Sequence, residues 1–263
     1  MKKCKILMPS GGLGGGIEAD AFANGMHMNP DVIAIDAGST DSGPAYLANA
    51  MCKTSRNVLK ADLEIAVRGS REGNIPLFIG SCGTCGSDNG VNEIADIVEE
   101  ILKANKWTAK IAKVYSEQNK DILKQKFKEG KIHPLEGAPE ITEQTFDECE
   151  HIVALMGAEP FIKAYQEGAD IVLCGRTTDT AIIAALPIMM GCNEAAAWHG
   201  AKTVECGSQC CDIEEGMGVF LEVDEEGFYV RPLNPKAHCT PYTISAHLLY
   251  ENVDPFCLVE PSG

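Results

Sequence analysis

The chain has 263 residues, with 22 Lys or Arg against 38 Asp or Glu, so its formal net charge is −16. Apolar residues make up 45% and charged residues 23%, proportions typical of a globular protein. The acidic charge argues against a nucleic-acid-binding protein and against docking on anionic membranes, because both need a basic surface.

The sequence predicts a cytoplasmic protein. Its N-terminal residues are charged but lack the apolar stretch and cleavage site of a signal peptide. The longest apolar run, residues 181–190, is too short to span a bilayer and contains Pro187. Without a signal peptide, the twelve cysteines are expected to be reduced thiols.

Short apolar runs alternate along the chain with segments of helical spacing. Strands are expected at residues 5–8, 32–36, 76–80, 110–115 and 171–174, and helices at 18–26, 53–71, 92–104, 119–128, 160–167 and 181–189. Residues 151–155 fit either a strand or the start of a helix. This alternation predicts a three-layer α/β fold with a mostly parallel sheet and helices on both faces.

The pattern changes after about Cys206. Residues 218–223 and 228–230 flank a turn at 224–227 and predict a β-hairpin, and residues 241–250 predict a final helix. The 27 residues from 204 to 230 contain no Lys or Arg, which is typical of an acidic solvated edge. We therefore expect a single α/β domain over residues 1–263, with 206–263 as a hairpin and helix appendage.

Parallel sheets bind ligands in the loops after the carboxyl ends of their strands. The first such loop, residues 11–16, is rich in glycine, so Gly12 and Gly14 are candidates for binding an anionic substrate group through backbone N–H groups. The spacing fits neither the dinucleotide-binding fingerprint nor the P-loop. A merely tight turn is the alternative.

The second loop, residues 36–44, contains two carboxylates and three hydroxyl groups. Asp36 and Asp41 are candidates for acid–base catalysis or for holding Mg²⁺, the one cofactor that the sequence suggests. Ser39 and Thr40 are candidate substrate contacts, and Arg56 is a candidate carboxylate clamp. The alternative is a turn in which Asp and Ser side chains cap the next segment.

The third loop contains Cys82 and Cys85 in a Cys-x-x-Cys arrangement that is compatible with metal or redox chemistry. Two cysteines supply only half of a zinc site, and completing it with Cys206, Cys210 and Cys211 requires a spacing that is not standard. We favour an anion-binding loop in which Ser81 and Gly83 contact the substrate and the thiols have no direct role.

The fourth loop follows residues 171–174 and precedes an apolar helix. Arg176 is a candidate for binding a substrate carboxylate, and Asp179 is a candidate acid–base group or helix cap. Thr177 and Thr178 are candidate substrate contacts. His199 is a further candidate, although a single histidine is more often structural; at helical spacing it shares a face with Lys202 and Cys206.

Several segments resemble the acyclic terpene utilisation (AtuA-like) family. They are residues 31–41, 156–162, 174–179, 197–200, 205–207, 232–235, 239–241 and 246–251. The resemblance implies a cytoplasmic protein of acid or acyl-CoA catabolism, sometimes with a small companion protein, and it transfers no catalytic residue. Family members usually extend well beyond this length, so we expect the chain to lack the family's C-terminal part. The thiol-rich segment at Cys82 and Cys85 departs from the family pattern.

The leading functional hypothesis is an enzyme of lyase, hydratase or isomerase type that acts on a small or CoA-linked carboxylic acid. Asp36, Asp41 or Asp179 would move protons, which requires carboxyl pKa values raised by burial or by like charge. The alternatives are a non-catalytic ligand-binding subunit that works with a companion chain and, third, a cysteine-ligated metal protein. A homo-oligomer is also expected, because enzymes of this class with an apolar helix such as residues 181–190 are often oligomeric.

Overall fold

The computed structural model describes residues 2–38, 42–213, 218–254 and 256–262. Its core is a seven-stranded sheet in the order β4-β5-β3-β2-β1-β6-β7. The strands are β1 (Lys3–Met8), β2 (Val32–Asp36), β3 (Leu77–Gly80), β4 (Ile111–Val114), β5 (Ile171–Cys174), β6 (Val219–Asp224) and β7 (Phe228–Pro232). The first five strands run parallel to one another, whereas β6 is antiparallel to β1 and β7 is antiparallel to β6.

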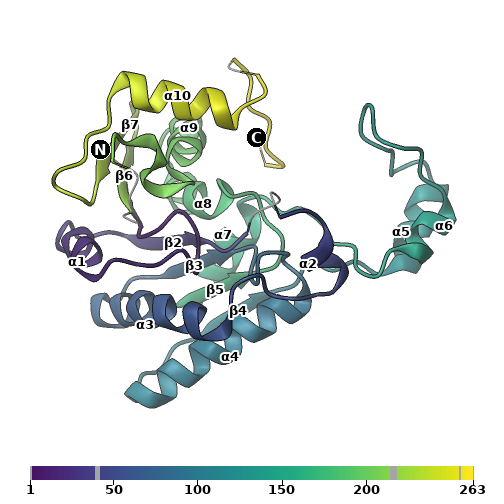
Figure 1. Ribbon diagram of the computed structural model, residues 1–263, viewed down its shortest axis with the longest axis horizontal. Coiled ribbons are helices and arrows are strands. Elements are labelled where there is room, and N and C mark those ends of the chain that lie inside the picture. Colours follow the sequence, from purple (N-terminus) through teal and green to yellow (C-terminus); the bar gives the residue numbers. More distant parts are fainter. Residues whose placement is uncertain (1, 39–41, 214–217, 255, 263) are drawn as a thin grey trace.

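Helices cover both faces of this sheet, which confirms the predicted three-layer α/β fold (Figure 1). One layer consists of α1 (Ala19–His27), α3 (Arg56–Gly73) and α4 (Asp88–Asn105), and the other consists of α7 (Glu159–Gln166), α8 (Ala181–Met190) and α9 (Glu194–Val204). The strands are apolar on both sides because successive side chains enter opposite layers: Ile33 and Ile35 pack with the first, Val32 and Ala34 with the second.

The predicted elements differ from the structure mainly at their ends. The helix expected from Lys53 begins at Arg56, because Ser55 has extended backbone angles. The helix expected from Asn92 begins four residues earlier, where the Ser87 side chain accepts a hydrogen bond from Gly90 N. Residues 151–155 form neither a regular strand nor a helix; Val153 makes only an isolated bridge with Glu117.

The predicted hairpin extends the main sheet. β6 pairs with β1 along six residues, from Lys3 opposite Asp224 to Met8 opposite Val219. The chain then passes to α10 (Pro241–Glu251), which lies against α9 (Figure 1). A short helix, α2 (Ala45–Ala48), follows β2.

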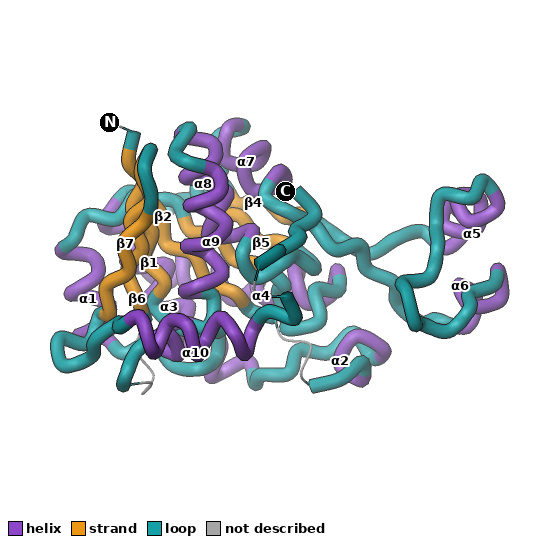
Figure 2. Tube along the Cα trace, turned by 90° about the horizontal axis from the view of Figure 1, so that it is seen from above, coloured by secondary structure: helices purple, strands orange, loops and turns teal. Residues whose placement is uncertain are grey.

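The chain segment between β4 and α7 forms an arm that contains α5 (Lys120–Lys128) and α6 (Glu143–Glu148). This arm projects from the body of the protein (Figures 1 and 2). Its two stems are hydrogen-bonded to each other, from Gln118 N to Ile152 O at 2.8 Å and from Ala154 N to Ser116 O at 2.9 Å. The two helices pack through Phe127 and Phe146, whose ring centroids are 5.6 Å apart. The arm therefore makes its own local contacts and leaves the sheet undisturbed.

Within the described ranges, no helix combines the length and the apolar character needed to cross a membrane. The carboxyl ends of the five parallel strands meet at one edge of the sheet, the edge at which β6 begins opposite Met8. The four loops identified from the sequence therefore lie along this edge.

Candidate functional site

Two buried carboxyl groups lie at the carboxyl ends of β2 and β5, the two strands that flank β3 in the sheet. Asp36 ends β2 and is only 3% exposed; its Oδ2 accepts a hydrogen bond from Gly38 N at 3.0 Å. Burial raises the pKa of Asp36 well above its usual range, and the nearby Asp179 carboxyl, in the loop after β5, raises it further. Burial likewise raises the pKa of Asp179, against the opposing effect of the Arg176 guanidinium. Burial therefore shifts both carboxyls towards the neutral form, relative to an exposed aspartate.

Arg176 is held close to the turn that follows Asp36. Its Nη1 donates to Thr84 O at 3.3 Å. A side chain at position 38 would not fit, because a Cβ on Gly38 would lie 2.8 Å from Arg176 Nη1 and 2.3 Å from Ser81 Cβ. Glycine at this position lets the two loops approach, which brings the cation near both acids.

Ser81 and Thr177 join the loops after β3 and β5. Ser81 Oγ donates to Thr177 O at 3.1 Å and accepts from Thr177 N at 3.2 Å, and both residues are fully buried. Gly83 is also buried; a Cβ there would lie 2.7 Å from Gly90 Cα. The structure therefore places Ser81 and Gly83 within the packing of the loops rather than on an open surface.

The glycine loop after β1 binds an anion that belongs to the chain itself. The carboxylate of Asp62, in α3, accepts hydrogen bonds from Gly14 N at 2.8 Å, Gly16 N at 3.2 Å and Ile17 N at 2.9 Å. Asp62 is 4% exposed. From the sequence, an external substrate anion and a merely tight turn were both open here. The N–H groups are bonded to Asp62, so Gly14 has a structural partner. Gly12 lies beside them, with its N–H donating to Ser10 Oγ at 3.3 Å.

A second set of charged side chains lies on α9, directly after α9 and on α10. Lys202 in α9 donates to Glu205 Oε1 at 2.5 Å and to Glu251 Oε2, in α10, at 3.4 Å. Burial raises the pKa of Glu205 to about 8, despite the attraction of Lys202. Burial disfavours the Lys202 ammonium, but the two carboxylates beside it raise its pKa above the usual value.

The set formed by Asp36, Arg176 and Asp179 and the set formed by Lys202, Glu205 and Glu251 interact with each other and form one site. The Asp179 carboxyl interacts electrostatically with Lys202, Glu251 and Glu260, and the Asp36 carboxyl with Glu205. Three buried carboxyl oxygen atoms have no hydrogen-bond partner among the described residues: Asp36 Oδ1, Asp179 Oδ1 and Glu260 Oε2. Buried polar atoms are normally satisfied, so unpaired carboxyl oxygens at one place indicate a position where a ligand or water completes the hydrogen bonding.

A cavity of about 910 Å³ adjoins this acidic group, between α9, α10 and the segment after α10. Its wall is largely apolar and includes Trp198, Leu248 and Leu249. Lys202 and Glu260 line the cavity and also interact with Asp179. His199 lies on the same wall, with its ring edge-on to Phe228 at a centroid distance of 5.1 Å. A largely apolar cavity thus lies beside the buried acids, and Lys202 and Glu260 connect the two.

One mixed set of side chains in this region could ligate a metal ion. Ligand atoms of Cys206, His247 and Glu251 all lie within 4.8 Å of one another, with Cys206 Sγ 3.6 Å from Glu251 Oε1. However, the Lys202 ammonium already neutralises Glu251, which disfavours a second cation there. Asp41, the other half of the expected Mg²⁺ pair, lies outside the described residues, as do Ser39 and Thr40.

The remaining predicted residues are not brought into this group. Arg56 pairs with Glu100 on the surface, with Nη2 2.5 Å from Oε1 and 40% of its side chain exposed. Thr178 Oγ1 accepts a hydrogen bond from Thr180 at 3.2 Å. Cys82 is buried in the layer under α3 and α4, away from Cys210 and Cys211, which belong to the opposite layer. The structure therefore does not bring Cys82 together with Cys210 and Cys211, as a zinc site completed by those residues would require.

Sequence reasoning missed Lys202, Glu205 and Glu251 as site residues. Two signals were present: Lys202 was placed on the helix face shared by His199 and Cys206, and both acids lie in segments of family resemblance. What the sequence alone did not provide was the position of α10, which brings Glu251 to Lys202.

Comparisons with known proteins identify the family. No curated protein and no solved structure gives a significant match. A family model described as acyclic terpene utilisation family protein AtuA matches residues 84–262, a segment that includes Arg176, Asp179, Lys202, Glu205 and Glu251 but not Asp36. Since the match spans well over half of the 263 residues, the chain belongs to the acyclic terpene utilisation family AtuA.

Proposed function

We propose that the chain is an enzyme that moves protons on an apolar, acyclic carboxylic acid or its CoA thioester, in a reaction of lyase, hydratase or isomerase type. The observation that carries the proposal is the group of buried carboxyls whose pKa values are raised, beside an apolar cavity. A carboxyl that is protonated near neutral pH can act as a general acid, and its conjugate base can accept a proton later in the same cycle.

The cavity supports an apolar substrate chain. Trp198, Leu248 and Leu249 offer apolar surface, and burying apolar surface is worth roughly 25 cal/mol per Å². Lys202 stands where this wall meets the acids and can bind the substrate's carboxylate or carbonyl oxygen. The reacting carbons would then lie near Asp179.

Arg176 and Asp179 have different roles in this proposal. The Arg176 guanidinium stabilises negative charge that develops on the substrate's carbonyl oxygen when a neighbouring C–H is deprotonated. Asp179, with one buried oxygen lacking a described partner, gives or takes the proton. Asp36 is a second buried carboxyl that interacts with Asp179 as a like charge, and this interaction raises the pKa of Asp36 further.

Exchange of substrate hydrogen for deuterium tests the proton transfer directly. Medium-chain branched and unbranched carboxylic acids, and their CoA thioesters, are incubated with the chain in D₂O, and loss of the C–H signals is followed by NMR. We expect exchange in the wild type and a loss of about 10²- to 10⁴-fold in Asp179→Asn, the range for removing a general acid or base. Arg56→Ala is the matched control, because Arg56 pairs with Glu100 on the surface.

Binding measured by calorimetry separates the alternatives. Tight binding with no exchange in the wild type would contradict the enzyme and favour the non-catalytic ligand-binding subunit. Leu248→Asp should weaken binding of long-chain acids far more than of acetate, because it places a charge in the apolar wall. Equal effects on both would refute the assignment of the cavity to the substrate chain.

A further inference from the structure

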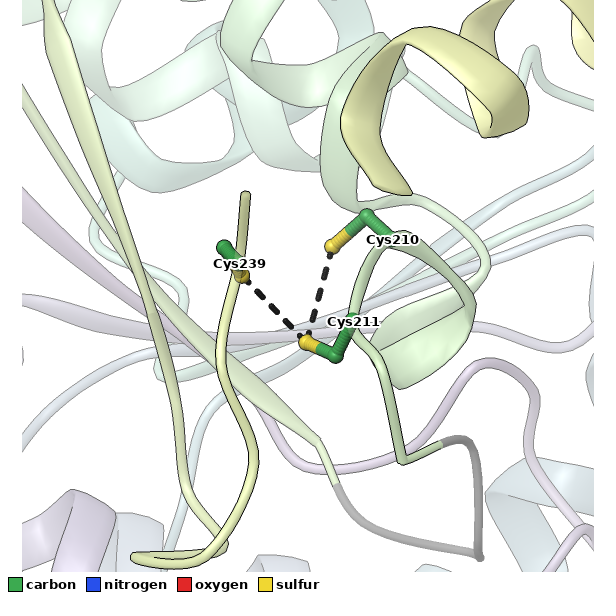
Figure 3. Close-up of side chains that lie close together, drawn as sticks. All are labelled: Cys210, Cys211 and Cys239. Carbon is green, nitrogen blue, oxygen red and sulfur yellow. Dashed lines mark hydrogen bonds between the residues drawn. The ribbon is translucent and has the colours of Figure 1, made fainter. Parts of the chain in front are cut away.

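The side chains of three cysteines that the proposed reaction does not use, Cys210, Cys211 and Cys239, lie close together (Figure 3). Cys210 is the last residue of a short 3₁₀ turn, η1 (Gly207–Cys210), Cys211 follows it, and Cys239 immediately precedes the N-cap of α10. Cys211 Sγ lies between the other two sulfur atoms, 3.3 Å from Cys239 Sγ and 4.0 Å from Cys210 Sγ. All three sulfur atoms lie within 4.8 Å of one another, and all three thiols are free.

These separations suit a thiophilic metal ion. Zn–S bonds are about 2.3 Å long, so two sulfur ligands of one tetrahedral zinc ion stand roughly 3.8 Å apart. The two sulfur–sulfur separations at Cys211, 3.3 Å and 4.0 Å, lie on either side of that value. Among the described residues, no other group of three thiols lies this close together.

The backbone holds the thiols in this arrangement without help from a metal. Asp212 N donates to His238 O at 3.0 Å, and His238 N donates to Asp212 Oδ1 at 2.7 Å. This pair of bonds clamps the two chain segments together one residue beyond Cys211 and one residue before Cys239. The positions of these two cysteines are therefore fixed by the fold, which lowers the entropy cost of binding an ion.

The surroundings suit a cation. Cys210 and Cys211 are buried, whereas Cys239 is half-buried, so the site is dry on one side and open on the other. The charged group next to Cys211 and Cys239 is the Asp212 carboxylate. The other set of potential ligands, Cys206, His247 and Glu251, is less suited to a cation because the Lys202 ammonium already pairs with Glu251.

We propose that Cys210, Cys211 and Cys239 bind one Zn²⁺ ion, which ties the turn after α9 to the start of α10. The ion binds as thiolates replace thiols, and the released protons pass to the solvent. A fourth position is left for water or a nearby oxygen ligand. The position of the ion indicates its role. Because α10 carries Glu251 and forms one wall of the cavity, a zinc ion bound at the start of α10 would hold that wall in place. This zinc site does not depend on the reaction proposed above.

Metal analysis of the full chain tests the proposal. The chain is purified without chelator, stripped of metal, reconstituted with Zn²⁺ under reducing conditions and assayed by elemental analysis. We expect about one zinc per chain in the wild type and in Cys149→Ser, whose cysteine lies at the end of α6 in the arm. Cys239→Ser should lose at least tenfold in zinc affinity, and Cys239→His should recover much of it, because imidazole also ligates zinc.

A second measurement on the wild type covers the case in which the variants fail to fold. The zinc-loaded chain is treated with a thiol-alkylating reagent with and without chelator, and the modified cysteines are mapped by mass spectrometry. Chelator should expose Cys210, Cys211 and Cys239 together. The proposal would be overturned if chelator left the labelling of these three cysteines unchanged, if it increased labelling at Cys206 instead, or if the reconstituted chain held no zinc. Each result would favour three thiols that merely pack in the core.

Discussion

The buried Glu205 carboxyl makes the stability of the fold depend on pH in a predictable direction. Its side chain is 2% exposed, and burial raises its pKa to about 8 from an ordinary 4.5. Below pH 4.5 the carboxyl is protonated in both the folded and the unfolded chain, so its contribution to stability is fully present. As the pH rises towards 8, only the unfolded chain releases the proton, and the free energy of unfolding falls.

The size of this effect follows from the gap between the two pKa values. At about 1.4 kcal/mol per pKa unit, the gap corresponds to about 5 kcal/mol lost between pH 4.5 and pH 8. Glu205→Gln removes the ionisation but keeps the shape and a hydrogen-bonding group for Lys202. The variant should therefore lose much less stability than the wild type over this range and should be the more stable protein at its upper end.

Urea unfolding at several pH values between about 5 and 8 provides the measurement. Asp36 and Asp179 stay in the variant, so the pH dependence that arises from their own raised pKa values should persist. Glu143→Gln, on the surface of α6, is the control and should show the wild-type pH dependence. If Glu205→Gln and the wild type lose stability in parallel as the pH rises, the burial argument for Glu205 is wrong.

Three further predictions concern the loops around the site. Gly38→Ala should destabilise the fold by about 1–3 kcal/mol in urea unfolding, since its Cβ would overlap the neighbouring loop, whereas Gly227→Ala, with open space around it, should change little. Asp62→Ala should cost about 2–4 kcal/mol because it leaves three backbone N–H groups without their carboxylate, and Asp62→Asn should cost less; equal losses would contradict the anion-binding role. Arg56→Ala should leave acid binding by calorimetry within twofold of the wild type, and a tenfold loss would return Arg56 to the site.

The fold could be predicted because its strands are short apolar runs separated by helices of regular spacing. Residues 32–36 and 171–174 are buried on both sides, and a continuous apolar run is what a parallel sheet with two helical layers requires. The position of the candidate site at the carboxyl ends of the strands follows from the same topology. Asp36, Arg176 and Asp179 were found in this way.

The partners of these residues depend on contacts that sequence patterns do not specify. Asp62 looks like an ordinary polar residue of a helix, and nothing local shows that it binds a loop more than forty residues earlier. Glu205 and Glu251 meet only because α10 packs on α9, a long-range contact. Arg56 illustrates the opposite error, since a cation near the right loop in sequence instead pairs with Glu100.

The hydrogen-bonded stems of the arm determine how the entropy cost of folding depends on the length of the arm. Because Gln118 N is hydrogen-bonded to Ile152 O, the arm is a loop whose two ends are held together at the body of the protein. Closing such a loop costs an entropy that grows only with the logarithm of its length, so doubling the length costs only about 0.6 kcal/mol. The insert can therefore lengthen or shorten over evolutionary time at little thermodynamic cost, while β4, β5 and the carboxyl group at the sheet edge keep their geometry.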